Sequence, residues 1–183
     1  MTVDNGRSLL GRELSGSRDA SGMRIAIIVA EFNKIFCERL LEGARQAILA
    51  HGGSEQLITT VWVPGSYELP LAAQSLADSG QFQAVIALGV LIKGDTDHYS
   101  QVANEACAGL TRVMLDSGLP IALGVIPALN IAQVEERSVV VDGKSSEDNK
   151  GWEVACAAIQ MVNLQNSIEQ TQLVQEPFLV NEE

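Results

Sequence analysis

The chain has 183 residues, with 12 Lys plus Arg against 23 Asp plus Glu, so its formal net charge is −11. Such an acidic surface repels phosphate backbones and anionic lipid headgroups, which excludes general binding to nucleic acid or to a membrane surface. Hydrophobic residues make up 46% of the chain, which excludes disorder throughout and predicts one domain with a sizeable core. Charged residues are only 19%, below the roughly 25% of an average domain, so we expect part of the surface to be buried in a homo-oligomer.

The N-terminal segment, residues 1–22, is rich in Gly and Ser and mixes acidic with basic side chains. This composition predicts a flexible arm and is typical neither of a secretory signal nor of a transit peptide. No apolar run reaches the ~20 residues that span a bilayer, so we expect a cytoplasmic protein. The three cysteines are widely separated and form no CxxC motif, which predicts reduced core thiols: Cys37, Cys107 and Cys156.

The first predicted element is a strand over residues 24–30, an apolar run of the kind that is buried on both faces of a sheet. Apolar residues then recur with 3.6-residue spacing, which predicts a helix over 33–51 that ends at the two glycines after it. A β-branched run predicts a second strand over 57–63. After a Pro-Gly turn, residues 67–76 form a predicted helix that tolerates Pro70 in its first turn.

The third predicted strand covers residues 84–92, and apolar residues between Val102 and Met114 mark a long helix that ends at Gly118. A fourth strand is predicted over 121–126. Three further segments follow, a short helix, a polar spacer and a longer helix, over residues 131–137, 138–148 and 149–164.

These elements predict a single domain over residues 23–168, between the arm of residues 1–22 and an acidic tail over 169–183. Strands that alternate with helices predict an α/β fold, a three-layer sandwich in which a four-stranded parallel sheet has helices on both faces. In such sheets, ligands bind beyond the carboxyl ends of the strands. The residues just after each strand are therefore the candidates for a site.

Two candidate features follow the third strand. Gly94-Asp95-Thr96 precedes a helix start, where free N–H groups can hold an anion; the alternative is an ordinary turn with Thr96 or Asp97 as N-cap. His98 lies in the first helical turn, where it either moves protons near neutral pH or is an exposed surface histidine.

The other strand ends offer an acid, an aromatic ring and two cations. Glu68 lies at a strand-to-helix turn, where it either complements the helix dipole or binds a ligand. Phe32 follows the first strand rather than lying within it, so its ring can stack on a planar ligand. Arg137 and Lys150 flank the polar spacer and are either solvated cations or anion ligands. The sequence contains no paired carboxylates, Ser/His/Asp arrangement, GxGxxG or Walker motif.

Taken together, these strand-end segments resemble the lumazine synthase family. The resemblance covers residues 23–164 in order and spacing. It is carried by five segments: Glu31-Phe32-Asn33, Leu40-Leu41-Glu42-Gly43-Ala44, Val63-Pro64-Gly65-Ser66-Tyr67-Glu68-Leu69-Pro70, Gly89-Val90-Leu91-Ile92-Lys93-Gly94-Asp95-Thr96-Asp97-His98 and Asn149-Lys150-Gly151-Trp152-Glu153.

The resemblance implies a condensing enzyme of riboflavin biosynthesis that uses no cofactor and no metal. Its substrates would be 5-amino-6-ribitylaminouracil and 3,4-dihydroxy-2-butanone 4-phosphate, and its product 6,7-dimethyl-8-ribityllumazine. In the family's terms, His98 would move protons. The pyrimidine and its ribityl chain would be held by Phe32, Asn33, Ser66, Tyr67, Glu68, Val90, Leu91, Ile92, Leu123 and Lys150. The phosphate would be held by Lys93, Gly94, Asp95, Thr96 and Arg137.

The resemblance also implies pockets shared between neighbouring subunits of a pentamer, with the region of Leu123 and Arg137 supplied by the neighbour. Family members form lone pentamers or icosahedral shells of pentamers. The polar spacer of residues 138–148 is longer than usual in the family and lies near contacts between pentamers, so we expect a pentamer, lone or paired. Residues 123–130 read Leu-Gly-Val-Ile-Pro-Ala-Leu-Asn where the family has Phe-Gly-Val-Leu-Thr-Thr-Asp-Thr, which removes a ring and several hydroxyls from one pocket wall.

Two alternatives share this fold and pocket. One is a riboflavin synthase of the archaeal type, which converts two lumazines, and the other is a non-catalytic carrier of lumazine or flavin. His98 and the Asn149-Lys150-Gly151 segment favour lumazine synthase over the first. A flavodoxin-like electron carrier is disfavoured because no flavin-phosphate loop follows the first strand.

Overall fold

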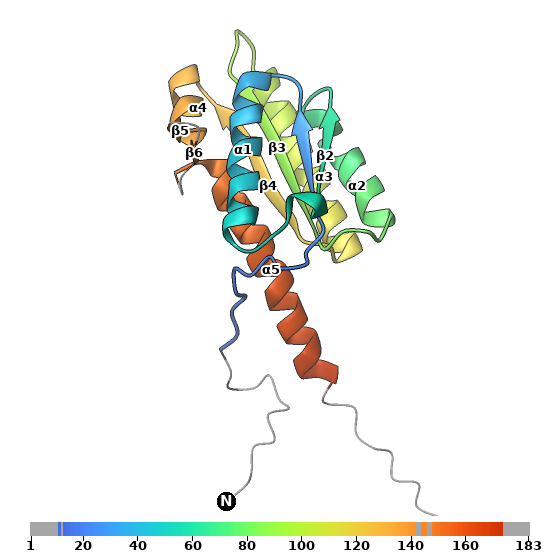
Figure 1. Ribbon diagram of the computed structural model, residues 1–183. Helices are drawn as coiled ribbons and strands as arrows, with labels where there is room; N and C mark the ends of the chain where they lie inside the picture. Colours follow the sequence, from blue (N-terminus) through green and yellow to red (C-terminus); the bar gives the residue numbers. More distant parts are fainter. Residues whose placement is uncertain (1–10, 12, 142–143, 146–147, 174–183) are drawn as a thin grey trace, which may run out of the picture.

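The main sheet has four parallel strands in the order β2-β1-β3-β4 (Figure 1). The computed structural model describes residues 11, 13–141, 144–145 and 148–173. Each strand was predicted, with ends that differ by no more than two residues. The strands are β1 Ile25–Ala30, β2 Ile58–Val63, β3 Ala84–Ile92 and β4 Ile121–Ala128. The predicted three-layer α/β fold is therefore confirmed.

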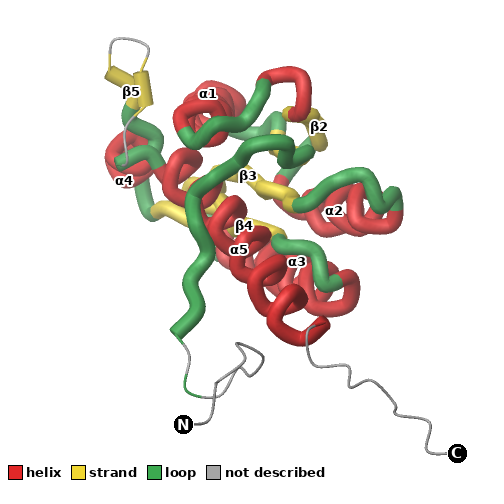
Figure 2. Tube along the Cα trace, turned by 60° about the horizontal axis from the view of Figure 1, so that its bottom comes forward, coloured by secondary structure: helices red, strands yellow, loops and turns green. Residues whose placement is uncertain are grey.

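Helices cover both faces of this sheet, as Figures 1 and 2 show from two directions. One face carries α1 and α5 and the other carries α2 and α3, while the short α4 follows β4. Within the described ranges, no helix is both long enough and apolar enough to cross a membrane. The helices are α1 Lys34–Ala50, α2 Leu69–Asp78, α3 His98–Ser117, α4 Ile131–Arg137 and α5 Lys150–Leu173, with two 3₁₀ turns, η1 Glu55–Leu57 and η2 Ser66–Glu68.

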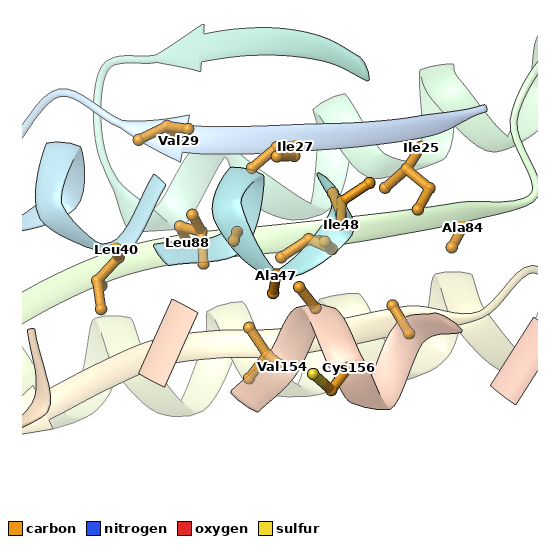
Figure 3. Packing of buried hydrophobic residues seen from close by; sticks show 14 of the residues in the cluster. Ile25, Ile27, Val29, Leu40, Ala47, Ile48, Ala84, Leu88, Val154 and Cys156 are labelled. Carbon is orange, nitrogen blue, oxygen red and sulfur yellow. The ribbon is translucent and has the colours of Figure 1, made fainter. Parts of the chain in front are cut away.

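Alternate residues of the two central strands build two cores. Ile25, Ile27 and Val29 of β1 point with alternate β3 residues towards α1 and α5, where Figure 3 shows them packed around Leu40 and Ile48. The residues between them pack against α2 and α3 on the other face. Because β1 is buried along its whole length, its sequence is continuously apolar rather than alternating.

Two features of the C-terminal region differ from the prediction. The last helix was predicted to end at Leu164, but α5 continues to Leu173, because no Gly or Pro occurs between Trp152 and that residue. The predicted polar spacer contains two short antiparallel strands, β5 Val140–Val141 and β6 Lys144–Ser145. The rest of the predicted tail, residues 174–183, lies outside the described residues.

The described end of the predicted N-terminal arm packs on the domain. The Asn163 Nδ2 group of α5 donates to the carbonyls of Ser17 and Asp19, at 2.9 Å each. Ala20 is fully buried, and its N–H donates to the carbonyl of His51 at 2.8 Å. Residues 1–10 and 12 of the arm lie outside the described residues.

The three cysteines form no disulfide, as predicted, and differ in burial. Cys37 and Cys156 are buried, whereas Cys107 is only partly buried and is therefore not the core residue that was predicted. Burial raises the pKa of the Cys37 thiol from 9.0 to about 11 and also raises the pKa of Cys107.

We therefore expect Cys37 to resist alkylation by iodoacetamide at pH 8 until the protein unfolds. A pKa two units higher makes its thiolate about a hundredfold scarcer, and its Sγ is also shielded from solvent. Peptide mapping of native and denatured samples measures this difference. Alkylation of Cys37 at equal rates in the two samples would contradict the burial described here.

Candidate active site

The carboxyl end of β1 is fixed to both neighbouring strands. Past the last β1 residue, the N–H groups of Glu31 and Phe32 donate to the carbonyls of Val63 and Pro64 at 2.8 and 3.2 Å. On the other side, the Asn33 Nδ2 group donates to the Val90 carbonyl of β3 at 2.9 Å. These three hydrogen bonds hold Phe32 beside the end of β2.

Asn33 has a left-handed backbone conformation, with φ of 58°, and is the one non-glycine residue with positive φ among those described. Asparagine tolerates this conformation better than most residues do. Its side chain makes no cap bond to α1 and is used for the bond to β3 instead. The turn from β1 into α1 is therefore sharp, and it leaves the residue Phe32 68% exposed.

Glycines let the turn after β2 lie close to β3. A Cβ at Gly89 of β3 would lie 2.4 Å from Ser66 Oγ, so only glycine leaves space for this buried serine. At Gly65, a Cβ would lie 3.2 Å from Glu68 Oε2, which places the Glu68 carboxylate over the start of η2. The Ser66 hydroxyl and the Glu68 carboxylate therefore belong to one turn, which packs against β3 through Ser66.

A pocket of about 330 Å³ opens where these strand ends meet α3. It contains six of the predicted site residues, which come from four separate segments of the chain. A second hollow of about 460 Å³ adjoins it and shares Tyr67, His98 and Val102. The first pocket is lined by Phe32, Pro64, Gly65, Ser66, Tyr67, Glu68, Leu91, His98 and Val102.

His98 is the first residue of α3 and lines both hollows. Its N–H donates to Thr96 Oγ1 at 3.4 Å, a bond within the turn before the helix, while Asp97 occupies the N-cap position and makes no side-chain cap bond. The Lys93 ammonium lies 3.9 Å from Asp97 Oδ1. Gly94, Asp95 and Thr96 are exposed, so this loop is accessible to a ligand.

β3 extends beyond its ladder with β1 beside the pocket. β3 pairs with β1 only as far as Leu88, but it pairs with β4 as far as Ile92. The backbone groups of Val90 and Ile92 therefore face the β1 side beyond the end of that ladder, and the Val90 carbonyl accepts the bond from Asn33. The Val90 side chain itself is buried in the core.

Ten of the sixteen predicted site residues do not line this pocket among the residues described. Asn33, Val90 and Ile92 are next in the chain to residues that do, and residues 93–96 form the loop before His98. The remaining three lie elsewhere. Leu123 lies on the edge strand β4 and is 43% exposed. Arg137 is the last residue of α4, and its Nη1 group donates to the Gln133 carbonyl at 3.0 Å. Lys150 begins α5, and its ammonium lies 2.7 Å from Glu153 Oε1. All three lie on the β4 side of the sheet, away from β2 and its turn.

The sequence did not identify the α3 residues that line the second hollow. Gln101, Val102 and Glu105 follow His98 at spacings of three, four and seven residues, so they share one face of the helix. This spacing is a signal that could have found them. Val102 was assigned only to the apolar face of the helix, although it also lines both hollows.

This pocket combines an exposed aromatic ring, a hydroxyl, a carboxylate and an imidazole. Such a set can stack on a planar ring, bind a chain of hydroxyls and move a proton. The chain also matches the family model described as 6,7-dimethyl-8-ribityllumazine synthase over residues 22–166, a range that contains the whole main sheet and every residue of the pocket. The resemblance of the sequence segments is thereby confirmed. The chain therefore belongs to the 6,7-dimethyl-8-ribityllumazine synthase family, whose members act in riboflavin biosynthesis.

Proposed function

We propose that this protein condenses 5-amino-6-ribitylaminouracil with 3,4-dihydroxy-2-butanone 4-phosphate to 6,7-dimethyl-8-ribityllumazine. The observation that carries the proposal is the meeting of Phe32, Glu68 and His98 in one pocket, although they are distant in sequence. Its volume of about 330 Å³ lies within the range of ordinary ligand sites. The reaction itself belongs to the family that the chain matches.

The uracil ring stacks on Phe32, whose exposed face borders the pocket. The ribityl hydroxyls bind at the η2 turn, where Ser66 and Glu68 supply a hydroxyl and a carboxylate. The backbone of β3 around Val90 and Ile92, beyond the end of its ladder with β1, supplies hydrogen-bonding groups at the edge of the ring. One side of the pocket is thus suited to a flat ring that carries a polyhydroxyl chain.

The chemistry requires proton transfers and correct positioning, and it requires no nucleophile from the protein. The 5-amino group attacks the ketone carbon, and loss of water gives an imine. Phosphate then leaves, and the ribitylamino nitrogen closes the ring with loss of a second water. His98 moves protons in these steps, because it is the imidazole that lines the pocket. Holding the two substrates in register supplies the rest of the acceleration.

The phosphorylated substrate needs cations, and the two that the family resemblance assigns to it outside the Lys93 loop, Arg137 and Lys150, do not line this pocket among the residues described. Exposed apolar side chains also occur on two separate parts of the surface. Leu71 lies on α2, whereas Leu115 and Met161 line a hollow beside the start of β4. Two different apolar surfaces suit head-to-tail contacts that close into a ring. We propose a pentamer in which a neighbour brings Leu123, Arg137 and Lys150 to the pocket.

The two-substrate assay tests this function, with absorbance of the lumazine product as the measurement. Product formation at a rate above the uncatalysed condensation is expected. Conversion of lumazine alone to riboflavin would identify a riboflavin synthase instead. Tight binding of lumazine without turnover of the two substrates would identify a carrier.

A further inference from the structure

Asn149 is a buried amide whose polar groups are all engaged. It is fully inaccessible to solvent. Its Nδ2 group donates to the carbonyls of Arg39 and Val139, at 3.1 Å each, and its Oδ1 accepts the N–H of Gly151 at 2.8 Å. A buried amide with every bond made fixes the segments that it joins.

These bonds join the two segments that carry the proposed anion-binding cations. Val139 lies two residues after Arg137, at the end of α4, and Gly151 directly follows Lys150 in α5. The third partner, Arg39, lies within α1 and anchors both segments to the body of the domain.

Glycines make the close approach of these elements possible. A Cβ at Gly43 of α1 would lie 2.2 Å from Asn149 Oδ1, and a Cβ at Gly151 would lie 1.9 Å from the Leu40 carbonyl. The Asn149 amide therefore occupies a space at the α1–α5 contact that a larger residue at position 43 would fill.

The hydrogen bond from Asn149 to Val139 also joins the two ends of the segment that lies between these residues. That segment, residues 140–148, contains the β5–β6 pair and belongs to the spacer that is longer than usual for the family. Because this bond joins the two ends of the segment, the distance between Arg137 and Lys150 does not depend on how long the segment is.

We propose that Asn149 is a positioning residue that holds Arg137 and Lys150 in register for one phosphate group. This inference rests on the proposed function, because it assigns both cations to the phosphorylated substrate. Asn149 itself touches no substrate.

The first test is Asn149→Ser. A serine oxygen still caps α5 but cannot donate to the two carbonyls. We expect the KM for the butanone phosphate to rise about tenfold, with kcat and the KM for the uracil substrate nearly unchanged. Gly43→Ala should change the same KM, because its Cβ displaces the Asn149 side chain without altering its chemistry.

Asn163→Ser is the matched control. Asn163 also lies in α5 and also donates from Nδ2 to two carbonyls, but these belong to the N-terminal arm. Its substitution removes the same kinds of bond far from both cations, so all three kinetic constants should stay at their wild-type values.

Two measurements separate this inference from the proposed function. The first is the Kd of inorganic phosphate, which should rise about tenfold in Asn149→Ser whether or not the protein makes lumazine. The second is hydrogen exchange, which should become faster in residues 138–141 while the Gly151 amide stays protected. A wild-type protein that binds phosphate but makes no lumazine would contradict the function alone. If Asn149→Ser and Gly43→Ala both assemble as the wild type does, and both keep its phosphate affinity and its KM for the butanone phosphate, the positioning role of Asn149 is wrong.

Discussion

His98→Ala is expected to lower kcat about a hundredfold, at the lower end of the usual contribution of a general acid–base group. His98 lines the pocket at the first residue of α3 but does not contribute the stacking surface. Binding of the ribitylaminouracil should therefore change by no more than about twofold, since Phe32 and the η2 turn remain. Steady-state kinetics together with titration of the uracil substrate measures both quantities.

The other histidine provides the control. His51 Nδ1 lies 2.7 Å from the Ala47 carbonyl, and its ring meets Trp152 edge-on, far along α1 from the pocket. His51→Ala should reduce stability but leave kcat at its wild-type value. If His98→Ala weakens binding as much as it lowers kcat, its main role is to support the site, and the proton-transfer assignment is wrong.

Arg137→Ala is expected to raise the KM for the butanone phosphate about 10- to 100-fold, which is the usual worth of charge-assisted hydrogen bonds. One N–H of Arg137 donates to the Gln133 carbonyl, which orients the guanidinium and leaves its other donors for a phosphate. The KM for the uracil substrate should stay nearly constant. Initial rates with each substrate varied in turn provide the measurement.

Arg137→Lys is the informative companion variant. Lysine keeps the charge but cannot bind phosphate through two parallel N–H groups, so its KM should fall between those of the wild type and Arg137→Ala. Equal KM values in all three proteins would remove Arg137 from the phosphate site and leave the Lys93 loop as its main ligand.

Much of the fold could be predicted because the strongest signals in this sequence are physical. β1 and β3 are buried on both faces, so their residues form uninterrupted apolar runs that have no other stable location. Gly118 has a φ of 68° and ends α3 where it was predicted to. The site could be located from topology, because the ends of parallel strands meet at one edge.

Other features depend on contacts that no local pattern reveals. The bond from Asn33 to Val90 and the space that Gly89 leaves for Ser66 each join residues that are distant in sequence. The β5–β6 pair was missed because its strands are only two residues long, within a polar segment. The role of Asn149 was not apparent either, since its partners come from α1 and from the end of α4.

The central claim is that the pocket in one chain is completed by Arg137 of a second chain. Mixing His98→Ala with Arg137→Ala subunits in equal amounts, after dissociation and reassembly, tests this claim directly at low butanone phosphate. In a head-to-tail ring, about a quarter of the sites then carry both intact residues, so the rate should recover to about a quarter of the wild-type rate. As a control, wild-type subunits are mixed equally with subunits that carry both substitutions. This mixture should also reach about a quarter of the wild-type rate if the sites are shared, but about half of it if each chain holds a complete site. A mixture no more active than its two components would contradict the shared site.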